Sequence, residues 1–190
     1  MTDRLAPALR RRHILTTAMK VIAQEGYCGL TLRAFAGHCG MTAPGLLHYF
    51  SGMPEILVAA LRLRDESDRA ELAAMLASTR TLREALDTVV GYNAARPERA
   101  RFYAVVQAEA IDPEHPAHDF FRERPTELAR LLARSDTTAG DEALVRHVLA
   151  VLDGLQTHWL LDPDTFSLTD AWTTVADALL GPTAQTPIRS

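Results

Sequence analysis

The chain has 190 residues, 47% of them hydrophobic, and a net charge of −4, which is enough apolar content for one large or two small globular domains. It contains no run of about 18 uninterrupted apolar residues and no apolar signal-peptide region, so we expect a cytoplasmic protein that does not enter a membrane. Without a secretory context, Cys28 and Cys39 are expected to be free thiols. Core packing is the simplest role for Cys39, and a redox sensor is the alternative.

Charge is distributed unevenly along the chain. Residues 1–50 hold six basic and two acidic side chains, a net charge of +4, which leaves −8 for residues 51–190 because the whole chain carries −4. The electrostatic part of DNA binding comes from local neutralisation of phosphates and not from total charge. The distribution therefore favours a nucleic-acid partner at the N-terminal end.

The first predicted helix runs from Leu9 to Gln24 and ends at Gly26. Its apolar residues recur at helical spacing: Ile14, Leu15, Ala18, Val21 and Ile22. The helix opens with three arginines at 10–12, where the helix dipole disfavours cations. A polyanionic partner would explain this run, and a solvated basic tail is the alternative.

Residues 31–50 predict a helix, a glycine-centred turn and a second short helix. Thr31 is a good N-cap for a helix that reaches about His38, and Gly40 suits a left-handed turn residue. Thr42 caps the next helix, and Pro44 falls in its first turn, where a missing N–H removes no internal bond. This is the pattern of a helix-turn-helix that reads DNA, with an ordinary helical hairpin as the alternative.

The second short helix has an inward and an outward face. We expect Leu46, Leu47 and Phe50 to point inward. Small residues at the start of the helix let the backbone approach a phosphate or a base edge closely. The expected outer surface consists of Thr42, Ala43, Pro44, Gly45, His48 and Tyr49.

These motifs together resemble the DNA-binding domain of the TetR/AcrR family of transcriptional regulators, over roughly residues 9–60. The resemblance rests on the arginine-initiated helix ending in Gly26-Tyr27, on Thr31-Leu32-Arg33, on Gly40, and on His48-Tyr49-Phe50. It implies that the residues that meet DNA are Thr31, Arg33, Thr42, Ala43, Pro44, Gly45, His48 and Tyr49. Many members have a tyrosine in place of Leu47 and a lysine in place of Met53, both associated with phosphates, so residues 10–12, Arg33 and Tyr49 would carry more of that contact here.

The rest of the chain has apolar residues at helical spacing in successive segments, and it shows no alternating pattern typical of strands. A long connecting helix is predicted over 54–77, followed by helices over 82–94, 97–111, 117–134, 142–161 and 168–180, with a break at 135–140. We therefore predict an all-α protein with a helix-turn-helix DNA-binding domain at 1–52. A helical-bundle domain for ligand binding and dimerisation follows at 53–181, and a disordered tail at 182–190.

The helices predicted over 142–161 and 168–180 have broad apolar faces. These faces consist of Leu144, Val148, Val151, Leu152, Leu155 and Trp159 on the first, and Leu168, Trp172, Val175, Ala176 and Leu179 on the second. Ala150 and Gly154 permit close helix approach. We expect a two-fold homodimer built as a four-helix bundle, as the family resemblance also implies, unless both faces are interior to a monomer. A dimer places two recognition helices roughly 34 Å apart and predicts a palindromic double-stranded DNA operator.

Aromatic and polar residues in the middle of the chain are candidates for a small-molecule effector site. They are Tyr92, Phe102, Tyr103, Gln107, His118, Phe121, His158 and Trp159. This composition suits a mainly apolar ligand, although aromatics at helical spacing also form cores. Ligand entry would tilt the helix over 54–77 and release DNA. Repression is the commoner outcome among members of the family.

Two other functions stay open at this point. Asp112, Glu114, His115, His118 and Asp119 are the densest cluster of possible metal ligands, so a small metal-dependent helical enzyme using the His115/His118 region is one alternative. A helical adaptor that binds protein is the other. No HExxH, CxxC pair, phosphate loop or nucleophile elbow occurs, so we expect neither an enzyme nor a bound metal or cofactor.

Overall fold

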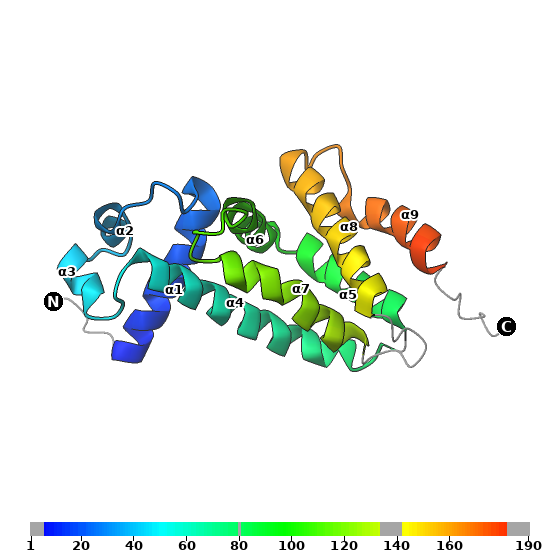
Figure 1. Ribbon diagram of the computed structural model, residues 1–190, viewed down its shortest axis with the longest axis horizontal. Helices are drawn as coiled ribbons and strands as arrows, with labels where there is room; N and C mark the ends of the chain where they lie inside the picture. The colour runs from blue at the N-terminus through cyan, green and yellow to red at the C-terminus, as the bar shows by residue number, and fades with distance from the viewer. Residues whose placement is uncertain (1–5, 80, 134–141, 182–190) are drawn as a thin grey trace. The chain divides into compact units, whose positions relative to one another are not determined.

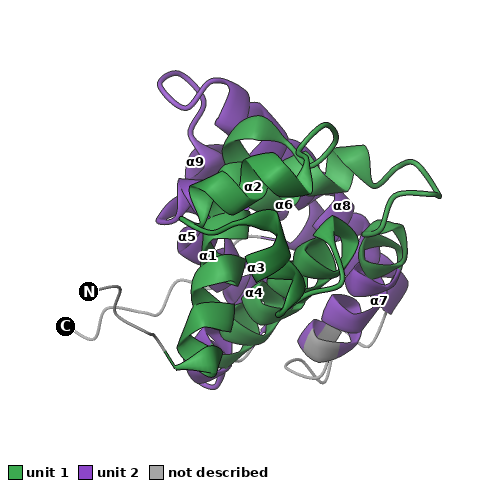
Figure 2. Cartoon of the chain, turned by 90° about the vertical axis from the view of Figure 1, so that its left-hand side faces the viewer, with its two compact units in different colours: residues 1–70, 101–122 green, residues 71–100, 123–190 purple. Residues whose placement is uncertain are grey.

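The computed structural model describes residues 6–79, 81–133 and 142–181. These residues form nine helices and no strand, which confirms the all-α prediction for the described part of the chain (Figure 1). The chain divides into two compact units (Figure 2): unit 1 contains residues 1–70 and 101–122, and unit 2 contains residues 71–100 and 123–190. Among the described helices, none is long and apolar enough to cross a membrane.

Unit 1 is built around the N-terminal helices. It holds α1 (Pro7–Glu25), α2 (Leu32–His38), α3 (Ala43–Leu47), the first part of α4 (Met53–Leu76), most of α6 (Pro97–Glu109) and the start of α7 (His118–Ala133). Helix α2 packs against both α1 and α3. The centre of its core is fully or almost fully buried and consists of Ile14, Ala18, Ile22, Phe35, Leu46, Ile56, Leu57 and Phe102.

Unit 2 is built around α5 (Leu82–Ala94), α8 (Glu142–Leu161) and α9 (Leu168–Leu180). Helix α9 packs against both α5 and α8. Trp172 of α9 is 2% exposed in this core, and its indole N–H donates to Asp87 of α5 at 2.6 Å. Arg83 of α5 also reaches α9, with 2.6 Å to Asp177 and 3.0 Å to the carbonyl oxygen of Gly181.

The predicted helix limits agree with the structure to within about two residues, except that the second short helix of 31–50 ends at Leu47, three residues earlier than predicted. The first helix begins at Pro7 rather than Leu9, and α6 ends at Glu109 rather than at residue 111. The first difference follows from Pro7, which is favourable in a first helical turn. The predicted domain limits at 52 and 181 stay predictions, and residues 135–140 and 182–190 lie outside the described residues.

Candidate nucleic-acid interface and effector site

The segment from α1 to α3 forms the helix-turn-helix through local capping and a shared core. The hydroxyl oxygen of Thr31 accepts from the Ala34 N–H at 3.2 Å, and that of Thr42 accepts from the Gly45 N–H at 3.2 Å. Gly40 has φ +62°, a left-handed conformation that favours glycine. These contacts confirm the predicted caps and the predicted turn.

The eight residues that the family resemblance associates with DNA all lie in unit 1 and all reach its surface. Five are exposed and three are partly exposed; the exposed ones are Thr31, Arg33, Thr42, Pro44 and His48, and the others are Ala43, Gly45 and Tyr49. A threonine hydroxyl that accepts a capping bond keeps its own hydrogen as a donor. Thr31 and Thr42 can therefore cap their helices and still donate to a phosphate oxygen.

The prediction that Leu47 points inward is wrong. Leu46 is fully buried and Phe50 is 2% exposed, but Leu47 is 50% exposed. The Phe50 N–H donates to the Leu46 carbonyl oxygen at 3.1 Å, so Phe50 stays beneath Leu46 although α3 ends at Leu47. Leu47 is rotated by about 100° from Leu46 about the helix axis. Leu47 therefore belongs to the outer surface of α3.

Arg11 has an internal role that was not predicted. Its Nη1 donates to the carbonyl oxygen of Tyr49 at 2.7 Å, and its guanidinium lies 4.0 Å from the ring centroid of Phe50. It also forms an ion pair of 3.7 Å with Glu55. The hydrogen bond from the Ser51 N–H, together with Arg11, holds the pKa of Glu55 below its ordinary value. Arg11 therefore ties α1 to the segment between α3 and α4.

The predicted effector residues are divided between the two units. Phe102, Tyr103, Gln107, His118 and Phe121 lie in unit 1, and Tyr92, His158 and Trp159 lie in unit 2. In unit 1 the Tyr103 ring contacts Phe102, Phe120 and Phe121, with centroids 6.0, 6.5 and 6.1 Å apart. Phe120 was missing from the predicted set. Its ring lies 5.1 Å from that of Phe121, to which it is adjacent in sequence.

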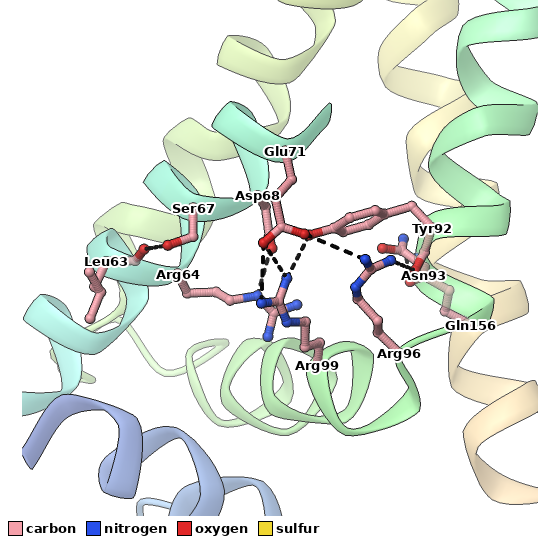
Figure 3. Close-up of polar contacts among 10 residues, drawn as sticks. All are labelled: Leu63, Arg64, Ser67, Asp68, Glu71, Tyr92, Asn93, Arg96, Arg99 and Gln156. Atoms are coloured by element: carbon pink, nitrogen blue, oxygen red, sulfur yellow. Dashed lines mark hydrogen bonds and ion pairs between the residues drawn. The ribbon is translucent and has the colours of Figure 1, made fainter. Parts of the chain in front are cut away.

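The candidates in unit 2 are engaged within that unit. The hydroxyl of Tyr92 donates to Glu71 at 2.9 Å and accepts from Arg99 at 2.6 Å, and Arg96 lies 4.0 Å from the ring centroid (Figure 3). Trp159 is 9% exposed in the core of unit 2. His158 is exposed and lies 6.1 Å from the ring of Phe166. Within unit 1, three of the predicted residues, Phe102, Tyr103 and Phe121, form an aromatic group with Phe120.

Three buried charged residues of α4 lie in unit 1 as well and were not predicted. Arg64, Asp65 and Asp68 are 5%, 8% and 8% exposed. Arg64 Nε donates to Asp68 at 2.6 Å (Figure 3), and its guanidinium lies 4.7 Å from the centroid of Tyr103. The sequence did contain a signal for them, because the buried positions 53, 56, 57, 60 and 61 continue at helical spacing to 64, 65 and 68.

A helix-turn-helix with an open outer face, followed by a larger set of helices, is an arrangement typical of DNA-binding regulators. The family model described as "Bacterial regulatory proteins, tetR family" matches residues 14–60. The chain is 23% identical over 177 residues to the transcriptional regulator BetI of Brucella anthropi, covering 89% of this chain and 91% of BetI. It is 27% identical over 164 residues to the regulator PksA of Bacillus subtilis, covering 81% and 80%.

Among solved structures, the multidrug binding protein EbrR, complexed with imidazole, aligns with a TM-score of 0.68 at 24% identity over 93% of each chain. This similarity concerns the fold. Together with the helix-turn-helix and the family-model match at residues 14–60, these relatives support a transcriptional regulator similar to the TetR/AcrR family.

Proposed function

We propose that this regulator binds a palindromic operator as a homodimer and is released by a small, mainly apolar effector, most simply as a repressor. The observation that carries this proposal is the open outer surface of the helix-turn-helix in unit 1, where all eight candidate residues are exposed or partly exposed. Operator binding requires access to chromosomal DNA, so the proposal includes a cytoplasmic location.

The proposed DNA contacts divide into two groups. Thr42, Ala43, Pro44 and Gly45 start α3 and have little side-chain bulk, so this end can enter a major groove and approach base edges closely. Arg33, Thr31, His48 and Tyr49 carry groups that can donate to phosphate oxygens. We therefore assign most of the base-sequence specificity to the start of α3. The phosphate contacts of the second group would set the orientation of the protein on the duplex.

We propose that the dimer forms through α8 and α9. The exposed apolar surface on these helices is smaller than the apolar faces predicted from the sequence. Most of the predicted apolar face belongs to the core of unit 2, since Val148, Leu152, Trp159, Trp172 and Ala176 are buried. Exposed apolar side chains that remain are Val151, Leu161 and Leu179. The exposed face of α8 also carries small residues, Ala143, Ala150 and Gly154, which suit close packing of two helices.

The proposed effector site is the aromatic group of unit 1 with the charged residues of α4 beside it. Tyr103, Phe120 and Phe121 are partly buried and offer ring faces, and Arg64 and Asp68 offer polar groups. A ligand that separates Arg64 from Tyr103 would displace α4, which begins at Met53, six residues after α3 ends. By linkage, the effector must lower operator affinity by the factor by which operator lowers effector affinity.

Selection of bound duplexes from random DNA tests the operator proposal. We expect enrichment of a two-fold symmetric site, with half-sites about one helical turn apart, roughly 34 Å. Inserting half a turn between the half-sites should then abolish tight binding, while inserting a full turn places them again on one face. Enrichment of an asymmetric site, or no enrichment at all, would contradict the proposal.

Arg33→Ala tests the assignment of phosphate contacts. We expect lower affinity for every duplex and a salt dependence whose slope falls by about one unit, because one charge contact is lost. Arg122→Ala is the matched control, since Arg122 is an exposed arginine on α7 that pairs with Asp119 in the same unit. An unchanged salt slope in Arg33→Ala would remove Arg33 from the interface.

A further inference from the structure

Three segments of unit 1 that are far apart in sequence bring potential metal ligands together. They are the loop after α1, the last residue of α6 and the loop between α6 and α7, which supply Cys28, Glu109 and His115. One ligand atom from each side chain lies within 4.8 Å of the other two. His118, which the sequence analysis paired with His115, is not in this group, and its Nδ1 lies 2.9 Å from the carbonyl oxygen of Ala110.

The Glu109 carboxylate is held in place by the backbone of the loop after α1. Its Oε1 accepts from the Tyr27 and Cys28 N–H groups at 3.1 Å each, and its Oε2 lies 3.0 Å from the Tyr27 nitrogen. Gly26 makes room for it, because a Cβ at this position would lie 2.8 Å from Oε1. An ionised carboxylate has about four lone-pair sites, so Glu109 can bind these amides and still coordinate a cation.

His115 is the second fixed member, and one of its ring nitrogens is unsatisfied. The residue is 8% exposed, and its Nε2 is buried with no hydrogen-bond partner among the described residues. The edge of the Tyr27 ring packs against it, with centroids 5.1 Å apart. A buried polar atom without a partner is uncommon, and an unplaced ion or water is one of its ordinary explanations.

The electrostatic surroundings favour a cation. Burial raises the pKa of the Cys28 thiol, and Glu109 and Asp112 raise it further by like charge. Burial lowers the pKa of His115, although Glu109 and Asp112 act in the opposite direction. A bound cation inverts the effect of the two carboxylates on the thiol, because it stabilises the thiolate that they disfavour.

We propose that Cys28, Glu109 and His115 form a binding site for a divalent metal ion of the zinc class. Thiolate, imidazole and carboxylate are the three ligand types that Zn²⁺ takes in proteins, and three protein ligands leave a fourth position for water. Cys28 is exposed, which gives the ion a path from solvent.

Coordination moves two protons. The Cys28 thiol releases its proton to solvent when the sulfur binds the metal. The His115 ring keeps one proton, which moves from Nε2 to Nδ1 when Nε2 becomes the ligand. Nδ1 then gives up the contact with the Ala117 N–H, which at 3.3 Å is already long for a hydrogen bond.

Titration of the metal-stripped full chain with Co²⁺, followed by absorbance, tests the site directly. We expect a thiolate-to-cobalt charge-transfer band in the near ultraviolet and competition by Zn²⁺. Cys28→Ala should abolish the band, and Cys39→Ala should keep it. His115→Gln should weaken Zn²⁺ binding by at least about tenfold, as loss of a metal-supporting group does, and His118→Gln should leave it unchanged.

Thermal unfolding of each variant without metal serves as the folding control, and only variants that unfold cooperatively are compared. Absence of the band in the parent chain, its persistence in Cys28→Ala, or equal Zn²⁺ affinity in His115→Gln would overturn the proposal. This experiment uses no DNA, so its outcome is independent of the operator proposal. Glu109→Gln is unsuitable as the deciding variant, because Glu109 also holds the loop after α1.

Discussion

At the scale of single residues, Gly26 combines a backbone requirement with a packing requirement. It has φ +79°, and the Glu109 carboxylate occupies the space that its Cβ would need. Gly29 has φ +98° with nothing within 4 Å of an added Cβ. The two positions therefore separate the cost of backbone conformation from the cost of displacing Glu109.

We expect Gly26→Ala to lower the free energy of unfolding by at least about 1 kcal/mol more than Gly29→Ala. Both variants place an L side chain at a positive φ, which costs on the order of 1–3 kcal/mol. Only the first also disturbs the hydrogen bonds of Glu109 to Tyr27 and Cys28. Urea unfolding of the two variants measures the difference, and equal losses would show that Glu109 moves aside without cost.

The two thiols are expected to differ sharply in reactivity. Cys39 is 4% exposed, and burial raises its pKa to about 11, so at neutral pH its thiolate is scarce and shielded. The pKa of Cys28 is raised too, by partial desolvation and by Glu109 and Asp112, but its thiol is exposed and accessible to a reagent. Treatment of the native chain with a thiol reagent and a chelator should therefore label Cys28 first and Cys39 only after unfolding. Cys28→Ser should remove the fast phase; two equal rates in the parent chain would contradict the burial of Cys39.

At the scale of helices, local pattern was sufficient to predict where most elements begin and end. Thr31 and Thr42 are N-caps as expected, and the chain leaves α1 at Gly26. Periodicity failed at Leu47, because two adjacent leucines in a helix of five residues cannot be assigned to faces without knowing the partner helix. The buried Arg64 was not predicted either, because helical spacing alone does not show that an arginine lies in a core.

The candidate site was predictable only where it lies within one continuous segment. The residues proposed to contact DNA all lie between Thr31 and Tyr49, so a single stretch of sequence was enough to propose them. Cys28 and Glu109 are 81 residues apart, and their contact depends on tertiary packing that no local spacing encodes. The effector candidates fall in both units and stay a prediction, because aromatic composition alone does not indicate which rings share a core.

The pairing of α5 with α9 provides a prediction at the scale of elements. Arg83 is 7% exposed and contacts Asp87, Asp177 and the Gly181 carbonyl. Burial alone would lower its pKa, but the hydrogen bonds to Asp177 and Asp87 outweigh it and raise the pKa, so the side chain stays charged.

We expect Arg83→Ala to cost about 2 kcal/mol of unfolding free energy. Fully buried pairs cost about 3–5 kcal/mol when one partner is removed, but Asp87 and Asp177 are 35% and 48% exposed and can be hydrated again. Arg62→Ala, at an exposed position of α4, should stay within about 0.5 kcal/mol. Chemical denaturation of both variants measures this, and equal changes would mean that α9 is held mainly by its apolar core.

At the scale of the whole molecule, the decisive question is whether the exposed face of α8 is covered by a second copy. Gly154 lies on this face, and an added Cβ there meets nothing within 4 Å in the chain itself. Replacing a helical glycine by a better helix former stabilises an isolated helix by up to about 1 kcal/mol. A larger side chain at Gly154 is therefore harmless to the single chain and harmful only to a closely packed partner.

Gly154→Glu is accordingly expected to convert a dimer into a monomer without unfolding it. Gly91→Glu is the matched control, because Gly91 is also an exposed helical glycine, on α5, with open space around an added Cβ. Analytical ultracentrifugation should give a dimer for the parent and for Gly91→Glu, and a monomer for Gly154→Glu. Operator affinity should fall only in Gly154→Glu, because two linked DNA-binding domains bind a symmetric site far more tightly than a single domain does. If Gly154→Glu remained dimeric with full operator affinity, the interface would have to lie elsewhere than on this face of α8.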